Sequence, residues 1–251
     1  MDTHTVATDA MTKAKIELAA AHRIAAIHEL DEGIDNHFTV TVPAKDGQYL
    51  VLPFGIHWSE AKASQMFTFD EQGRTLEGTG HVELSARCIH APIHRITGKR
   101  VVMHTHQTWA LALNMLKDNR LLPATQTAAF FHDQVAYDDT YKGTADTLEE
   151  GERLAALMGD KSIVFMKNHG ILCAGDTVAE AYRRLYKMER VCRTQVLALS
   201  TGKELNILSG DVIAAVVAPA EQESHPREER DRLFFEAMMR IVDRELPGYR
   251  G

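Results

Sequence analysis

Short apolar runs separated by turn residues recur early in the chain and constrain its fold more than any other feature. Residues 38–42 and 49–52 are rich in apolar and β-branched side chains, and Asp46-Gly47 lies between them. This pattern predicts a β-hairpin, with a third strand at residues 66–69. Hairpins pair strands in antiparallel fashion. The sequence therefore favours an α+β or three-layer sheet over a regular βαβ winding.

Helical spacing of apolar residues marks much of the remaining chain. It predicts helices over residues 9–30, 58–65, 82–96, 109–116, 148–158, 177–199 and 231–242. Further buried strands are predicted at residues 101–104, 134–137, 163–166 and 171–173. The polar stretch 218–229 contains two prolines and is typical of a linker or exposed arm. We expect one domain over residues 1–210, with an arm and helix over 211–251 that pack on it or on a neighbouring subunit.

Charge and cysteine content argue against several classes of protein. The 28 lysine and arginine residues are outnumbered by 35 aspartate and glutamate residues, for a net charge of −7, whereas nucleic-acid binders carry basic patches. The three cysteines form no CxxC pair, which argues against a disulfide framework. No apolar run reaches the roughly 20 residues that span a bilayer. We expect a cytoplasmic protein that binds neither membranes nor nucleic acid.

Histidines carry the strongest chemical signal. His104 and His106 end an apolar run, and side chains at i and i+2 of a strand share a face, so both imidazoles can face one ion or both can be ordinary structural residues. His169 interrupts two apolar strands just before a glycine, as a loop ligand or a simple turn would. Three neutral imidazoles suit a catalytic metal site with open positions. Zinc fits best, and iron, manganese and nickel also accept imidazole.

Other motifs carry less weight. His90 and His94 lie four residues apart on one predicted helix face, but Pro92 lies between them and the chain has no HExxH motif. GxGxxG, GxxxxGK[ST] and GxSxG motifs are also absent from the sequence, which argues against common nucleotide-binding and serine-hydrolase sites.

Five motifs, in order, resemble the class II aldolase/adducin superfamily, and most closely its adducin-like branch. They are LVLPFG at 50–55, CIHAPIH at 88–94, VVMHTH at 101–106, KNHGILCAG at 167–175 and a helix that begins TVAEAYRRLYKMERVC at 177. The resemblance covers residues 20–202, most of the chain. The superfamily includes metal-dependent sugar-phosphate aldolases and epimerases, such as fuculose-phosphate aldolase and ribulose-phosphate 4-epimerase.

The resemblance implies an α/β fold with three α/β/α layers and a central, mainly antiparallel sheet. It implies a divalent metal, usually Zn²⁺ with Fe²⁺ and Mn²⁺ as alternatives, on His104, His106 and His169. It also implies a homotetramer with active sites between neighbouring subunits and a small-molecule substrate. The usual reaction is retro-aldol cleavage, in which the metal stabilises an enediolate and a carboxylate moves the proton.

The catalytic region departs from the aldolase pattern. The register of the family's Ser-Ser-Glu motif places Ala86 where the catalytic glutamate would stand. Glu83 either supplies that carboxylate from a shifted position or is a helix N-terminal acid favoured by the dipole. The aldolases' tyrosine proton donor is replaced near Thr127. His132 or Tyr137 would then serve as an acid that reaches a neighbouring subunit's metal, unless both belong to aromatic core filling.

The phosphate pocket departs from the pattern as well. The aldolases' Gly-Gly-Asn and Pro-Ser-Gly turns correspond here to residues 34–37 and 53–55. The residues that we assign to substrate binding are Asn36, His37, Phe54 and Gly55. Asp35 would repel a phosphate and Phe54 would crowd it, because a buried dianion needs compensating donors. We therefore expect a small, non-phosphorylated hydroxy-carbonyl or hydroxy-acid substrate.

Three functions are compatible with these features. The leading one is a metal-dependent lyase of the class II aldolase type. The second keeps the three histidines but uses Fe²⁺ for decarboxylating oxygenase or decarboxylase chemistry. The third is a non-catalytic assembly module like adducin, against which the retention of His104, His106 and His169 argues.

Overall fold

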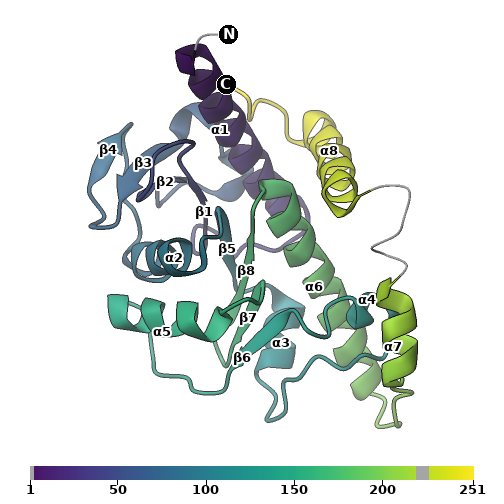
Figure 1. Ribbon diagram of the computed structural model, residues 1–251. Helices are drawn as coiled ribbons and strands as arrows, with labels where there is room; N and C mark the ends of the chain where they lie inside the picture. Colours follow the sequence, from purple (N-terminus) through teal and green to yellow (C-terminus); the bar gives the residue numbers. More distant parts are fainter. Residues whose placement is uncertain (1–2, 219–225) are drawn as a thin grey trace.

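The computed structural model describes residues 3–218 and 226–251, which contain one eight-stranded sheet (Figure 1). The strands are β1 (His37–Thr41), β2 (Gln48–Val51), β3 (Phe67–Asp70), β4 (Thr75–Glu77), β5 (Val101–Thr105), β6 (Val135–Asp138), β7 (Ile163–Met166) and β8 (Gly170–Gly175). Their order is β4-β3-β2-β1-β5-β8-β7-β6. The β6–β7 pair is parallel and the other neighbouring pairs are antiparallel, which confirms the mainly antiparallel sheet.

The helices follow most of the predicted ranges. They are α1 (Thr3–Ile27), η1 (Trp58–Glu60), η2 (Ala63–Gln65), α2 (Leu84–Thr97), α3 (Thr108–Asn114), α4 (Gln126–Ala129), α5 (Leu148–Met158), α6 (Val178–Leu199), α7 (Gly210–Val217) and α8 (Arg227–Glu245). The single helix predicted at 58–65 is wrong. Ala61 and Lys62 are extended, with ψ of 132° and 150°, and they divide this stretch into two 3₁₀ turns.

Helices cover both faces of the sheet (Figure 1). Successive residues of a strand point to opposite faces, and on β5 Met103 packs in the core shared with α1 and α6 whereas Val102 packs in the core shared with α2 and α5. Helix α3 packs on α6 and therefore belongs to the α1 side. The three-layer α/β/α architecture is confirmed.

Pro92 lies inside α2 and does not end it. Proline has no N–H, so the carbonyl of Cys88 loses its helical hydrogen bond. Gly151 of α5 packs at this position, where an added Cβ would lie 1.8 Å from the Cys88 oxygen. The glycine thus allows α5 to pack closely on α2, which fixes the helix that carries His90 and His94.

The C-terminal helix α8 packs on α1 and α6 of the same chain (Figure 1). Phe235, Val242 and Tyr249 are buried in the core, and Asp231 pairs with Arg183 at 2.5 Å. Residues 219–225, part of the predicted linker, lie outside the described residues. Within residues 3–218 and 226–251, no helix combines the length and apolarity that crossing a bilayer requires.

Candidate functional site

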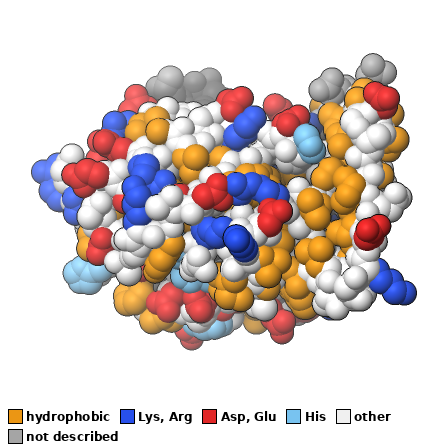
Figure 2. Space-filling model, turned by 90° about the horizontal axis from the view of Figure 1, so that it is seen from below, with side chains coloured by type: hydrophobic (Ala, Val, Ile, Leu, Met, Phe, Trp, Pro, Cys, Tyr) orange, Lys and Arg blue, Asp and Glu red, His pale blue; other side chains and the backbone are white. Residues whose placement is uncertain are grey.

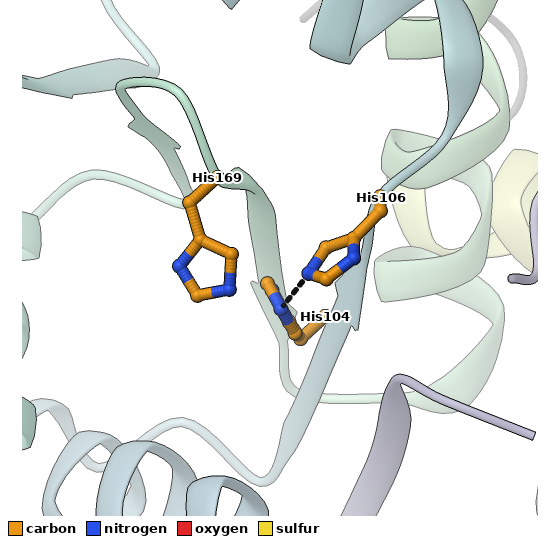
Figure 3. A group of neighbouring side chains, drawn as sticks. All are labelled: His104, His106 and His169. Atoms are coloured by element: carbon orange, nitrogen blue, oxygen red, sulfur yellow. Dashed lines mark hydrogen bonds between the residues drawn. The ribbon is translucent and has the colours of Figure 1, made fainter. Parts of the chain in front are cut away.

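His104, His106 and His169 lie together at one end of the central strands (Figure 3). One ring nitrogen from each lies within 4.8 Å of the others. His104 belongs to β5, His106 follows that strand, and His169 lies in the turn between β7 and β8. Because β8 pairs antiparallel with β5, the turn before β8 lies beside the end of β5. The sheet pairing therefore brings together the three predicted ligands.

The Nδ1 atoms of two of these imidazoles are already engaged. His104 Nδ1 donates to the carbonyl oxygen of Ile171 at 3.0 Å, and His106 Nδ1 donates to the Glu32 carboxylate at 2.5 Å. With the proton on Nδ1, each Nε2 carries a lone pair. The two Nε2 atoms lie 3.1 Å apart (Figure 3). Two lone pairs at this distance repel each other unless a cation lies between them, so the donor set fits a divalent ion.

Burial favours the neutral form of His104 and of His169. It lowers the pKa of His104 well below its ordinary value. Burial, and next the neighbouring His106, lower the pKa of His169 to about 4. Neutral imidazoles offer their lone pairs without first losing a proton.

The turn that carries His169 is held in place by Asn114, which sequence patterns did not indicate, and depends on the glycine that follows the histidine. Asn114 of α3 donates to the carbonyl oxygens of Met166 at 2.5 Å and Gly170 at 2.9 Å. An added Cβ at Gly170 would lie 2.5 Å from the Thr105 oxygen and 2.8 Å from Cδ2 of His106. Only glycine therefore lets this turn approach the other two predicted ligands.

A small cavity lies next to this group; none of the three histidines lines it, but two of its lining residues, Asn36 and His37, contact them. Its lining includes Asn36, His37, Phe54 and Glu83, all of them predicted site residues. The Asn36 side-chain oxygen accepts from the His106 backbone N–H at 3.0 Å, and His37 pairs across the strands with His104. Gly55 forms an exposed turn beyond the lining.

Glu83 lies at the N-cap position of α2, but its side chain makes no capping hydrogen bond. It accepts instead from the hydroxyl of Ser85 at 2.7 Å. The carboxylate thus lies at the cavity and does not cap the N-terminus of the helix. Ser85 stands at the register of the second serine of the Ser-Ser-Glu motif.

His132 and Tyr137 lie away from the three histidines within the described chain. His132 is exposed and contacts Asp133 at 3.1 Å. The Tyr137 hydroxyl accepts from the backbone N–H of Leu121 at 3.0 Å, and the Arg120 guanidinium lies over its ring. A role for either residue in a neighbouring subunit's site stays a prediction.

Comparisons with known proteins agree with this geometry. Residues 16–196 match the family described as Class II Aldolase and Adducin N-terminal domain. An aldolase class 2 homologue from Caulobacter vibrioides is 32% identical, covering 96% of this chain and 93% of its own length. An aldolase II superfamily protein from Pseudomonas syringae has a TM-score of 0.89 at 32% identity, covering 96% of both chains.

A more distant structure shares the fold. The L-fuculose 1-phosphate aldolase from Glaciozyma antarctica has a TM-score of 0.81 at 23% identity, covering 94% of this chain and 92% of its own. The family match covers most of the chain and includes all three histidines. The chain belongs to the class II aldolase and adducin family.

Proposed function

We propose that this protein is a divalent-metal-dependent lyase that performs (retro-)aldol C–C bond cleavage. The substrate is a small, non-phosphorylated hydroxy-carbonyl or hydroxy-acid compound. The observation that carries the proposal is the convergence of three imidazole nitrogens beside a cavity that Glu83 lines. A divalent ion, Zn²⁺ in the first instance and Fe²⁺ or Mn²⁺ as alternatives, would polarise a carbonyl and stabilise enediolate charge when bound.

The surrounding residues orient the ligands and the substrate. His104, His106 and His169 would hold the ion, while the Ile171 carbonyl and Glu32 fix two of the rings. The Asn36 oxygen is engaged by the His106 backbone. Its amide NH₂ group is therefore the part that donates to a substrate oxygen.

Glu83 moves the proton in the proposed reaction. Its carboxylate lines the cavity and is oriented by the Ser85 hydroxyl at 2.7 Å. In the cleavage direction it takes the proton of the substrate hydroxyl as the C–C bond breaks, and it returns a proton to the enediolate carbon. A positioned acid–base group of this kind contributes roughly 10²- to 10⁴-fold to the rate.

The lining of the cavity supports a substrate without phosphate. Among the described residues that line it there is no lysine or arginine, and Phe54, Trp58 and Ile34 contribute apolar surface beside Glu83. A phosphate dianion next to a carboxylate, without cationic partners, would lose its hydration and gain little in return.

We propose in addition that the protein assembles as a homotetramer with active sites between subunits, in which His132 or Tyr137 would reach a neighbour's site. Exposed apolar side chains support subunit contact. They gather on the right of the face in Figure 2, and Leu199, Ile207 and Val212 are exposed at the end of α6 and near α7. On the rest of this face acidic and basic side chains are interspersed. Light scattering that shows a monomer at working concentration would contradict the assembly.

Metal analysis of anaerobically purified protein, followed by substrate screening with the metal-replete enzyme, tests the function. We expect one divalent ion per chain and turnover of unphosphorylated aldol donors. A kcat/KM near or above about 10⁴ M⁻¹s⁻¹ on fuculose phosphate or ribulose phosphate would contradict the substrate class. Bound Fe²⁺ with substrate-dependent oxygen uptake would favour the oxygenase. Protein without stoichiometric metal would favour a non-catalytic module like the adducins.

A further inference from the structure

A chain of hydrogen-bonding side chains lies buried between β1 and α2, next to the cavity. His37 and Thr39 share one face of β1, and His90 and His94 share one face of α2. The two pairs interleave, so that the hydrogen-bonded side chains follow one another in space in the order His94, Thr39, His90, His37. All four side chains are buried.

Short contacts connect these residues to the backbone at one end. His94 Nδ1 lies 2.7 Å from the carbonyl oxygen of Lys99. The Thr39 hydroxyl lies 2.8 Å from His94 Nε2 and 2.6 Å from His90 Nδ1. His90 Nε2 lies 2.8 Å from His37 Nδ1. The spacing is that of well-formed hydrogen bonds throughout.

The Lys99 carbonyl sets the direction of these hydrogen bonds. A carbonyl oxygen only accepts, so His94 Nδ1 donates to it and His94 Nε2 accepts from Thr39. The Thr39 hydroxyl then accepts from His90 Nδ1, and His90 Nε2 accepts from His37 Nδ1. The other nitrogen of His37, Nε2, is left with a lone pair.

Neutral imidazoles are required for this direction, and burial supplies them. Burial lowers the pKa of His94 to about 4 and that of His90 well below its ordinary value. Each ring therefore carries a single N–H near neutral pH.

At the cavity end the chain is one proton short. Ser85 lies between His37 and Glu83, with its hydroxyl oxygen 3.2 Å from His37 Nε2 and 2.7 Å from the Glu83 carboxylate. Three neutral imidazoles and two hydroxyls supply five protons for the six contacts between Lys99 and Glu83. Ser85 donates across its short contact to Glu83. The longer contact, between the Ser85 hydroxyl and His37 Nε2, is thus left without a proton, and His37 Nε2 receives no donor within this series.

A second buried imidazole presents an unpaired acceptor. His22 of α1 is fully buried, and its Nδ1 donates to the Leu18 carbonyl at 2.8 Å. Its Nε2 has no hydrogen-bond partner among the described residues. His22 lines the same cavity as His37 and Glu83, so three side chains of this cavity present acceptors.

We propose that the cavity binds a hydroxyl-bearing end of the substrate, with His37 Nε2 and His22 Nε2 each accepting a hydrogen bond from a ligand hydroxyl. Thr39, His90 and His94 are positioning residues that hold His37 in the accepting tautomer. This inference rests on the proposed function, because it names the part of that substrate that lies beside the three histidines. An acceptor-rich cavity favours a polyol and disfavours phosphate, which brings charge and few protons.

Nitrogen-15 NMR of histidine-labelled protein tests the tautomer directly. We expect His37 to carry its proton on Nδ1 in the wild-type protein and in Ser85→Ala, because the direction is set from the Lys99 end. Thr39→Val removes the acceptor of His90, so the hydrogen bonds reverse and the His37 proton moves to Nε2. Thr39→Ser restores the wild-type spectrum. A wild-type His37 protonated on Nε2, or no change in Thr39→Val, would overturn the proposal.

Thr68→Val is the matched control. Thr68 is a buried threonine of β3 in the same sheet, and it does not belong to the hydrogen-bonded series between Lys99 and Glu83. Its replacement should leave the His37 tautomer unchanged. A shift of the His37 proton in this control as large as that in Thr39→Val would show a general response of the sheet and would overturn the positioning role of Thr39.

Titrations with fragments test the recognition. Glycerol and dihydroxyacetone should shift the Nε2 resonances of His22 and His37, and inorganic phosphate and dihydroxyacetone phosphate should bind more weakly. The loss of one hydrogen bond in Thr39→Val or His22→Phe should raise the dissociation constant for dihydroxyacetone about 3- to 10-fold. Tighter binding of dihydroxyacetone phosphate, or wild-type affinity in both variants, would overturn the proposal.

Neither measurement needs turnover, so the two proposals can fail separately. An enzyme that shows no lyase activity, but has the accepting His37 and binds dihydroxyacetone, would refute the proposed function and support this inference. An active lyase with His37 protonated on Nε2 would support the proposed function and refute this inference.

Discussion

The Nδ1 atom of His106 lies 2.5 Å from a carboxylate oxygen of Glu32, a residue that precedes it by 74 positions. Glu32 follows α1, and its side chain is 57% exposed. A carboxylate on the far nitrogen of a ligand imidazole fixes the ring and raises its basicity. In the proposed metal site, the pairing would give an exposed glutamate a part in metal affinity.

Glu32→Ala should weaken metal binding about 10- to 100-fold, because the His106 ring loses its orienting partner while all three ligands remain. Competition with a chromophoric chelator measures the dissociation constant. Glu29→Ala, at an exposed position three residues earlier, should keep wild-type affinity. Equal affinities in the two variants would show that the contact is incidental.

His169→Ala should abolish stoichiometric metal binding and leave the protein folded. Two imidazoles remain, which is one fewer than a catalytic site of this type normally holds. Elemental analysis and circular dichroism report the two properties. Replacement of His57, which lies at the surface and pairs with Ser59, is the control. Full metal content in His169→Ala would rule out the assigned ligand set.

Glu83→Gln should lower kcat about 10²- to 10⁴-fold with little change in KM, because the amide retains the size of the side chain but does not accept a proton. Steady-state kinetics on the substrate found by screening provide the measurement. Glu77→Gln, on exposed strand β4, should behave as wild type. Normal kcat in Glu83→Gln would show that Glu83 has no catalytic role and is only an acid at the helix N-terminus.

The free energy of unfolding should fall between about pH 6.5 and pH 4 through His22. Burial lowers the pKa of His22 from 6.5 to about 4. The unfolded chain therefore binds a proton in this range before the folded chain does, and the stabilisation present above pH 6.5 is progressively lost. The contribution is about 2–4 kcal/mol.

Urea unfolding of the wild type and His22→Phe across this pH range tests that contribution. The variant should show a shallower pH dependence, because phenylalanine does not titrate. Identical slopes in the wild type and His22→Phe would contradict the linkage.

Phe235→Ala should reduce the free energy of unfolding by about 3–5 kcal/mol while unfolding remains a single transition. Phe235 of α8 is 2% exposed and packs in the core beneath α1 and α6. Leu233→Ala, at a position 43% exposed, should have little effect. A separate early transition for α8 would show that residues 226–251 form an independent unit.

Local periodicity was sufficient to predict many parts of this structure. The residues at 148–158 alternate at helical spacing and form α5 over that same range. The two histidines of the HTH segment lie near each other because they are two residues apart at the end of a strand. Both patterns depend on residues close in sequence, where strand and helix geometry apply directly.

Contacts between distant segments were beyond such patterns. Glu32 is an exposed acid in a turn, and nothing local distinguishes it from Glu29. The interleaving of Thr39 with His90 and His94 depends on how α2 crosses β1, so the two histidines first resembled a weak metal pair. Strand β4 was missed because all three of its residues are exposed and show no apolar alternation.

The interleaving of β1 with α2 also bears on how the central sheet finds its alignment. A slip of β1 by one residue would turn His37 and Thr39 toward the apolar layer beneath α1 and bring Phe38, which packs in that layer, against α2. The slipped arrangement would bury two polar side chains without partners, at about 1–3 kcal/mol each. The polar residues beside the cavity thus discriminate against misaligned sheets while the protein folds.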